Sequence, residues 1–291
     1  MGGKVKVLVL AGNGINCEYE TAHAFRLAGA EEVEIVFIYD LLEGSKSLDD
    51  YHILCFPGGF LDGDDLGAAK ACANRFLHAR VKRTGERLWD QVLRFIEEGK
   101  LILGICNGFQ LLVKMGLVPA MGGRYGQQQA TLTFNDSGRF EDRWVYLKVN
   151  PSSRCVFTHG LEKLYLPVRH GEGKFLVADH GVLGKLFEGG FVVLQYADRD
   201  LNPTMQYPLN PNGSDGAVAG ICDPSGRVFG LMPHPEAFHH FTNHPRWRRE
   251  SLPEVGEGVE IFRRGVQFIN CLLYTPPSPR DLSTSRMPSS A

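Results

Sequence analysis

The chain has 291 residues, of which 43% are hydrophobic and 22% are charged, a composition typical of a globular protein of one or two domains. Its net charge of −2 gives no electrostatic basis for binding nucleic acid or an anionic membrane surface. No run approaches the ~20 apolar residues of a membrane span, and residues 1–12 lack a signal-peptide core. The seven cysteines follow no zinc-binding or C-x-x-C spacing, so we expect free thiols in a reducing cytoplasm.

The first part of the chain alternates strand-like and helix-like segments. Apolar runs at residues 5–11, 33–39 and 51–56 predict three strands, the first of them buried, and a helix is expected over residues 18–28. This alternation predicts an α/β fold in which a mostly parallel sheet is flanked by helices.

A glycine-rich turn, Gly12-Asn13-Gly14, follows the first strand. It could begin a dinucleotide-binding site, but Cys17 stands where that motif needs its third glycine. A tight turn from strand to helix is the simpler interpretation.

The third strand leads into Pro57-Gly58-Gly59 and then into a polar connection, residues 61–87, with a helix expected over residues 68–80. Glycines allow a backbone to approach a ligand closely. Three acidic residues of the connection could form a metal cluster, although a solvated loop is the expected interpretation: Asp62, Asp64 and Asp65. An amphipathic helix is expected over residues 88–98.

The stretch from Lys100 to Met115 contains the candidate nucleophile. It predicts a buried strand over residues 101–105, followed directly by a helix, with Cys106 between Gly104 and Gly108 at the junction. A sharp turn from strand to helix would lift the thiol out of the sheet and hold it at a helix N-terminus, as in a nucleophile elbow. That position favours the thiolate. A buried structural cysteine is the alternative.

The second half is richer in strand patterns. Residues 127–134 and 143–149 alternate as strands, and residues 135–142 are expected to join them as a hairpin. Further strands are expected at residues 192–196, 218–222 and 227–231. We expect these segments to form an antiparallel β extension over the carboxyl edge of the sheet, where α/β proteins bind ligands. Four arginines could form an anion-binding or docking set or a scattered solvated face: Arg124, Arg139, Arg143 and Arg169.

A histidine and a carboxylate follow the last of these strands. His234 could act as the base for Cys106, and Glu236 could orient the imidazole, which is the logic of a catalytic triad. The flanking Pro233 and Pro235 would hold this loop rigid. His239, His240 and His244 come shortly after and could bind a metal, but a triad needs none.

These residues resemble a known family. Residues 104–110 and 234–236 are similar to the nucleophile and His-Pro-Glu motifs of the class I, triad-type glutamine amidotransferases, which have a flavodoxin-like fold. The resemblance covers residues 4–269. Four further stretches are similar to the branch of this family that supplies ammonia for making formylglycinamidine ribonucleotide in purine biosynthesis: residues 56–60, 135–141, 170–173 and 207–214.

The resemblance implies a function. Cys106, His234 and Glu236 would hydrolyse L-glutamine to glutamate and ammonia through a thioester. Gly58 or Gly59 and Asn107 would form the oxyanion hole. Gln110, His170 and Glu172 would lie in the substrate pocket. The chain itself would need neither cofactor nor metal. An ATP- and magnesium-dependent synthetase subunit or domain, with a small adaptor subunit in some systems, would use the ammonia.

Two alternatives remain open at the sequence level. One is a glutaminase of the same superfamily that serves GMP, CTP or anthranilate synthesis. The other is a non-catalytic, redox-sensing or chaperone-like α/β protein with a reactive cysteine, which the His234–Glu236 arrangement disfavours.

The end of the chain differs in character from the rest. A helix is expected over residues 259–269, with its apolar residues on one face. Residues 271–291 are rich in proline and serine and are expected to be disordered and non-native in origin. The expected amidotransferase domain is therefore residues 4–270.

Overall fold

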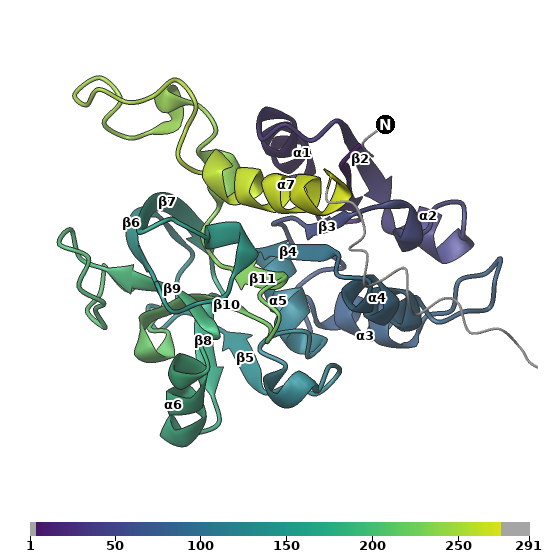
Figure 1. The fold of residues 1–291 in the computed structure, drawn as a ribbon. Coiled ribbons are helices and arrows are strands. Elements are labelled where there is room, and N and C mark those ends of the chain that lie inside the picture. The colour runs from purple at the N-terminus through teal and green to yellow at the C-terminus, as the bar shows by residue number, and fades with distance from the viewer. Residues whose placement is uncertain (1–3, 275–291) are drawn as a thin grey trace, which may run out of the picture.

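A computed structural model describes residues 4–274 of the chain (Figure 1). Its helices and strands, in chain order, are β1 Lys6–Ala11, α1 Glu18–Leu27, β2 Glu32–Phe37, α2 Ile38–Glu43, β3 Ile53–Phe56, α3 Lys70–His78, α4 Leu88–Glu97, β4 Leu101–Ile105, α5 Asn107–Lys114, β5 Ala130–Thr133, β6 Glu141–Val149, β7 Lys163–His170, β8 Lys174–Val177, α6 His180–Glu188, β9 Val192–Ala197, β10 Val218–Cys222, β11 Val228–Leu231 and α7 Val259–Tyr274.

One sheet runs through the molecule in the order β2-β1-β3-β4-β11-β10-β9-β6-β7. The strands from β2 to β11 are parallel to one another, and those from β11 to β7 are antiparallel. A separate two-stranded sheet joins β5 to β8. The predicted fold class, a parallel sheet with an antiparallel extension, is confirmed.

Helices cover both faces of the parallel part. Helix α7 packs on α1 at one face, while α3 packs on α4 and α5 at the other (Figure 1). Helix α4 shows why: Leu88, Val92, Phe95 and Ile96 are buried on one side, as the 3.6-residue period requires. Burying each such side chain stabilises the fold by roughly 1.5–3 kcal/mol.

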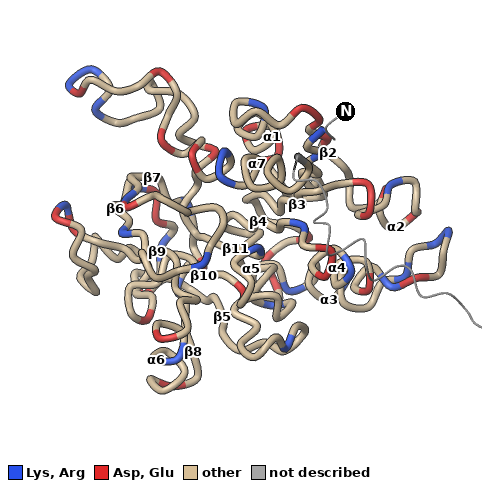
Figure 2. The backbone as a smooth tube through the Cα atoms, in the orientation of Figure 1, with Lys and Arg blue, Asp and Glu red and all other residues tan. Residues whose placement is uncertain are grey.

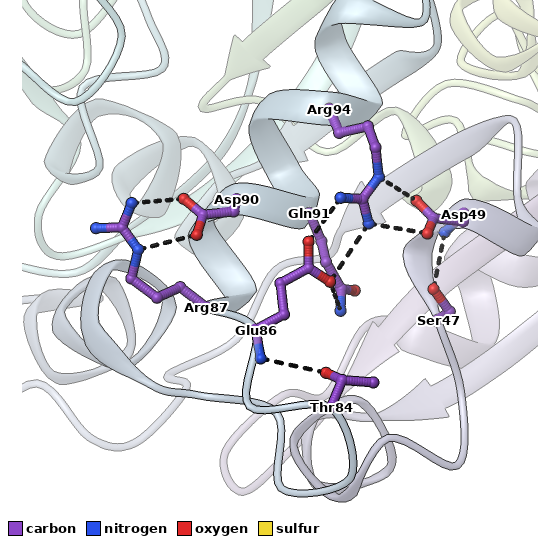
Figure 3. A network of polar contacts seen from close by, with 8 residues as sticks. All are labelled: Ser47, Asp49, Thr84, Glu86, Arg87, Asp90, Gln91 and Arg94. Atoms are coloured by element: carbon purple, nitrogen blue, oxygen red, sulfur yellow. Dashed lines mark hydrogen bonds and ion pairs between the residues drawn. The ribbon is translucent and has the colours of Figure 1, made fainter.

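Ion pairs fix the outer side of α4 (Figure 3). Arg94 binds the carboxylates of Asp49 and Glu86, and Arg87 binds Asp90. All of these side chains are at least partly exposed, so each pair contributes about 0–1 kcal/mol. Their role is mainly to set where α4 lies against the short helical turn at Leu48–Asp50.

Charged residues of both signs are spread along the whole backbone (Figure 2). This agrees with the small net charge. Among the helices of residues 4–274, none is long and apolar enough to cross a membrane.

The predicted end of the second strand, residues 33–39, is wrong. β2 ends at Phe37, and α2 begins at Ile38. Ile38 and Leu41 are both buried, and their spacing of three residues is that of a helix. Because the apolar residues of α2 follow directly on those of β2, the two elements look like one longer strand in the sequence.

The predicted hairpin of residues 127–149 is also wrong. β5 pairs with β8, while β6 pairs with β7 and β9, so the two strands belong to different sheets. Neither β7 nor β8 was anticipated, nor was α6. Pro167 interrupts the pattern of β7, and it is accommodated because β7 is the last strand of its sheet, where a missing N–H costs no ladder bond.

The expected boundary near Cys271 is too early. Helix α7 continues to Tyr274, and Leu273 packs against the core. The remainder of the predicted tail, residues 275–291, lies outside the described residues, so its expected disorder and foreign origin stay predictions.

Candidate active site

Cys106 lies at a sharp junction between β4 and α5. Its backbone angles are φ 50° and ψ −102°, a conformation that costs about 1–3 kcal/mol for a residue other than glycine. The residue caps the N-terminus of α5, where the helix dipole favours a negative charge. This is the elbow that the sequence predicts.

Gly108 allows the elbow to form. A Cβ atom at this position would lie 1.9 Å from the backbone oxygen of Phe56 on β3. The first turn of α5 therefore packs directly on the neighbouring strand, which any larger residue would prevent.

His234 is brought to the elbow by the next strand of the sheet. β11 pairs in parallel with β4, with Leu231 opposite Ile105, and the N–H of Cys106 donates to the oxygen of Leu231 at 2.8 Å. Both strands thus end at the same level. The N–H of His234 donates to the oxygen of Pro167 on β7 at 2.8 Å, which fixes the loop.

Glu236 orients the imidazole. Nδ1 of His234 lies 2.5 Å from Oε1 of Glu236, and both side chains are buried. Burial opposes a charge on His234, but the Glu236 carboxylate and the Cys106 thiol outweigh it, and the pKa of His234 is raised well above its ordinary value. The imidazole is therefore suited to take up and hold a proton beside Cys106.

The predicted oxyanion loop lies against this pair. A Cβ atom at Gly58 would stand 2.6 Å from Cε1 of His234, so only glycine fits. The side chain of Asn107 joins the loop to α5, because its Oδ1 accepts from the N–H of Leu61 at 3.1 Å and its Nδ2 donates to Gln110 at 3.0 Å. Gly59, next in the loop, bridges to Ile15.

A cavity of about 590 Å³ opens above Cys106 and His234. Gln110, His170 and Glu172, which the sequence places in an expected substrate pocket, all line it. Gln110 donates to the backbone oxygen of Glu172 at 2.6 Å, and Oε2 of Glu172 accepts from the N–H of Ala68 at 3.2 Å. These bonds hold both side chains in place.

His170 is built to stay neutral. Burial, together with the nearby His234, lowers its pKa to about 3. Its Nδ1 lies 3.1 Å from Oδ1 of Asn135, and the amide of Asn212 lies 3.5 Å from Nε2. A neutral imidazole whose two nitrogens both have partners serves as a structural wall of the pocket rather than as a second base.

Sequence reasoning missed Cys17. Its thiol contacts His234, and burial raises its pKa. Cys17, His234 and Glu236 are, in the described part of the chain, the one group of three side chains placed closely enough to hold a metal ion. The short bond between His234 and Glu236 already engages two of them, so we interpret the group as part of the triad. Cys17 reaches the site because β1, which it follows, lies beside β3 in the sheet, a pairing that no local sequence pattern shows.

The acidic residues of the loop after β3 are not simply solvated. Asp62 pairs with Arg75 at 3.0 Å, whereas Asp64 and Asp65 line the active-site cavity. Burial, together with Glu172, raises the pKa of Asp64. The turn at Gly12–Gly14 packs against this loop: a Cβ atom at Gly14 would lie 2.2 Å from the oxygen of Phe60, which supports the interpretation as a tight turn.

The three downstream histidines have separate partners. His239 packs on His23, the ring of His240 bonds Thr242, and His244 is surrounded by aromatic rings. Each imidazole therefore has a local structural role.

The four arginines do not form one set. Arg169 lines the active-site cavity and pairs loosely with Asp142. Arg143, on the neighbouring strand β6, binds Glu141 and Tyr207. Arg124 donates to the oxygen of Met121. The backbone N–H of Arg139 donates to the hydroxyl of Ser137.

Comparison with known proteins agrees with this geometry. Residues 4–269 match the model of the CobB/CobQ-like glutamine amidotransferase domain. The chain is 49% identical over 265 residues to the phosphoribosylformylglycinamidine synthase subunit PurQ of Dehalococcoides mccartyi, covering 91% of this chain and 98% of that protein. It is 44% identical over 276 residues to a PurQ subunit of Methanococcus maripaludis, covering 91% and 97%.

A solved structure is also similar. A chain of the structure titled PurLQS from Thermotoga maritima superposes with a TM-score of 0.65 at 29% identity, covering 92% of this chain and 100% of that one.

Proposed function

The chain belongs to the CobB/CobQ-like glutamine amidotransferase family, and on that premise we propose that it is the glutaminase of a phosphoribosylformylglycinamidine synthase. It hydrolyses L-glutamine to glutamate and ammonia. The observation that carries this assignment is the convergence of Cys106 with the buried His234–Glu236 pair at the ends of two adjacent parallel strands, in a chain so similar to PurQ subunits.

The first half of the reaction is an acyl transfer. The sulfur of Cys106 attacks the side-chain carbonyl carbon of glutamine, and His234 takes up the thiol proton. Negative charge develops on the carboxamide oxygen, where backbone N–H groups of Gly58 or Gly59 and of Asn107 stabilise it. His234 then gives its proton to the leaving nitrogen, and ammonia departs.

The second half releases glutamate. Water attacks the thioester carbon while His234 accepts its proton, the carbon–sulfur bond breaks, and the proton returns to the sulfur of Cys106. Glu236 holds the imidazole in one orientation and stabilises its positive charge throughout.

The charges of the cavity suit an amino acid zwitterion. Asp64, Asp65 and Glu172 line it together with Arg169. The acidic groups can accept bonds from an α-ammonium, and the guanidinium can bind an α-carboxylate. Gln110, His170 and Glu172 then form the walls that position the substrate.

The ammonia passes to an ATP- and magnesium-dependent synthetase, either alone or together with a small adaptor subunit. Three phenylalanines at the cavity are 45–69% exposed, and exposed apolar groups of this kind mark docking sites: Phe60, Phe134 and Phe140. We place the synthetase contact there, with Arg169 at its edge. Docking at Phe60 would also act on the adjoining oxyanion loop, so the partner would activate the isolated glutaminase.

We also place the protein in the cytoplasm. The proposed nucleophile is a thiol, and a reducing compartment keeps thiols in their reduced, reactive form.

The direct test is ammonia release from L-glutamine by the purified chain, alone and with a synthetase partner, formylglycinamide ribonucleotide, ATP and magnesium. The Cys106→Ala variant should lose all activity above background, whereas Cys271→Ser, which alters a cysteine outside this cavity, should keep it. Full activity in the Cys106→Ala variant would refute the assignment.

A further inference from the structure

A second cavity, of about 810 Å³, lies away from the active site. It is formed by the segment that follows β6, the turn between β10 and β11, and residues 264–271 of α7. Arg227 stands at the amino end of β11, and His234 follows its carboxyl end. The two cavities therefore open at opposite ends of the same strand, and neither shares a lining residue with the other.

The lining of this cavity is basic. Arg154, His159, Arg227 and Arg264 line it, and no Asp or Glu of residues 4–274 does. Two carboxylates lie behind it. Glu260 stands 3.7 Å from Arg264, and the buried Asp223 accepts from the backbone N–H groups of Arg227 and Val228. Over the described residues, neither the guanidinium of Arg154 nor that of Arg227 forms an ion pair with a carboxylate.

The guanidinium of Arg227 has fewer hydrogen bonds than it can form. Its backbone is fixed by Asp223, and one Nη donates to the oxygen of Ile96 at 3.4 Å. Its Nε is buried and has no acceptor in the described structure, and the same is true of Nε in Arg264. A buried donor without an acceptor is unfavourable, so neither guanidinium has a full set of bonds that would oppose its turning toward an anion in the cavity.

We propose that this cavity binds a phosphate-bearing small molecule. Guanidinium groups bind phosphate oxygens through paired N–H bonds. The volume lies within the range of about 300–1,000 Å³ that is usual for small-molecule sites. The polar side chains of Asn150, Ser153 and Gln267 and the ring of Phe268 can contact the remainder of a nucleotide. The site is separate from glutamine hydrolysis and does not depend on it.

Calorimetric titration of the full chain tests the proposal. The probes are inorganic pyrophosphate, ADP and, as the uncharged control, adenosine, at low salt because phosphate contacts are screened. We expect pyrophosphate and ADP to bind and adenosine not to bind. If ADP binds more tightly than pyrophosphate, the cavity recognises the nucleoside as well as the phosphates. If the two bind equally, it recognises the phosphates alone.

Charge-matched variants locate the site. Arg227→Gln and Arg154→Gln should each weaken pyrophosphate binding by about tenfold or more. Arg199→Gln, which removes an exposed arginine that does not line the cavity, should change it by less than about twofold. Arg154 is exposed, so its replacement leaves folding intact even if Arg227→Gln proves unstable. No binding at millimolar pyrophosphate, or an equal loss in Arg199→Gln, would overturn the proposal.

Discussion

Two cysteines contact the same imidazole, and the structure separates their roles. Both stand at the N-cap of a helix, but Cys106 does so in a strained elbow, whereas the pKa of Cys17 is raised by burial. Since the thiolate is the reactive form, proximity to His234 alone does not make a nucleophile. The elbow does, and it was visible in the sequence.

This difference predicts selective labelling. The glutamine-like electrophile 6-diazo-5-oxo-L-norleucine should modify Cys106 and leave Cys17 unmodified, because only Cys106 stands in the strained elbow, whereas burial raises the pKa of Cys17 and so lowers its thiolate fraction. Peptide mass spectrometry after partial inactivation measures both sites. Labelling of Cys17 at the same rate as Cys106 would contradict the assignment of the nucleophile.

His170 predicts a pH dependence of stability. Its folded-state pKa is lowered from 6.5 to about 3, so between these values the unfolded chain binds a proton that the folded chain does not. Stability therefore falls as the pH decreases below about 6.5, by about 1.4 kcal/mol per pH unit for this residue. Above that pH the residue has no such effect.

Urea unfolding at pH 7.5 and 5.5 isolates this effect. The wild type should lose about 1.4 kcal/mol more between the two pH values than the His170→Asn variant, since the other groups titrate alike in both. Equal losses in the two proteins would show that His170 is not held neutral.

At the scale of elements, the oxyanion loop can lie close to the triad because Gly58 has no side chain. A Cβ atom on Gly58 would collide with His234. We expect Gly58→Ala to lower kcat/KM by about 10²–10³-fold, because the imidazole or the oxyanion donors must move. Gly184→Ala, in α6, is the matched control, since its Cβ would meet no atom within 4 Å. Near-normal turnover in Gly58→Ala, measured by ammonia release, would argue against this loop.

The length of α7 gives a further element-scale prediction. A chain ending after Asn270 loses Leu273, which packs on the core, and this should cost about 1–2 kcal/mol. Its melting temperature should drop by about 2–6 °C. A chain ending after Tyr274 should melt with the full-length protein. If both truncated chains melted alike, the last turn of α7 would contribute nothing.

The errors of the sequence analysis have a common cause. Alternation identified the strand character of residues 130–133 and 143–149, but pairing is decided by contacts far along the chain, and β5 pairs with a segment more than 40 residues away. Pro167 concealed an edge strand. The elbow, by contrast, is a local arrangement of strand, glycine and helix, so Cys106 could be placed from sequence, whereas Cys17 could not.

At the scale of the molecule, the fold explains why residues more than 100 positions apart form one site. Parallel strands end at one edge, and β1, β3, β4 and β11 deliver Cys17, Gly58, Cys106 and His234 to it in turn. The antiparallel part adds the pocket walls through β7, which ends at His170. The exposed phenylalanines at the mouth of the cavity leave this edge ready for a partner.

The most direct test of the whole account separates ammonia production from ammonia use. With a synthetase partner, formylglycinamide ribonucleotide, ATP and magnesium, the wild-type chain should support amidine formation from either L-glutamine or ammonium chloride. The Cys106→Ala complex should form the amidine from ammonium chloride at the wild-type rate and from L-glutamine at background only. Glutamine-dependent formation by the Cys106→Ala complex at the wild-type rate would contradict the account.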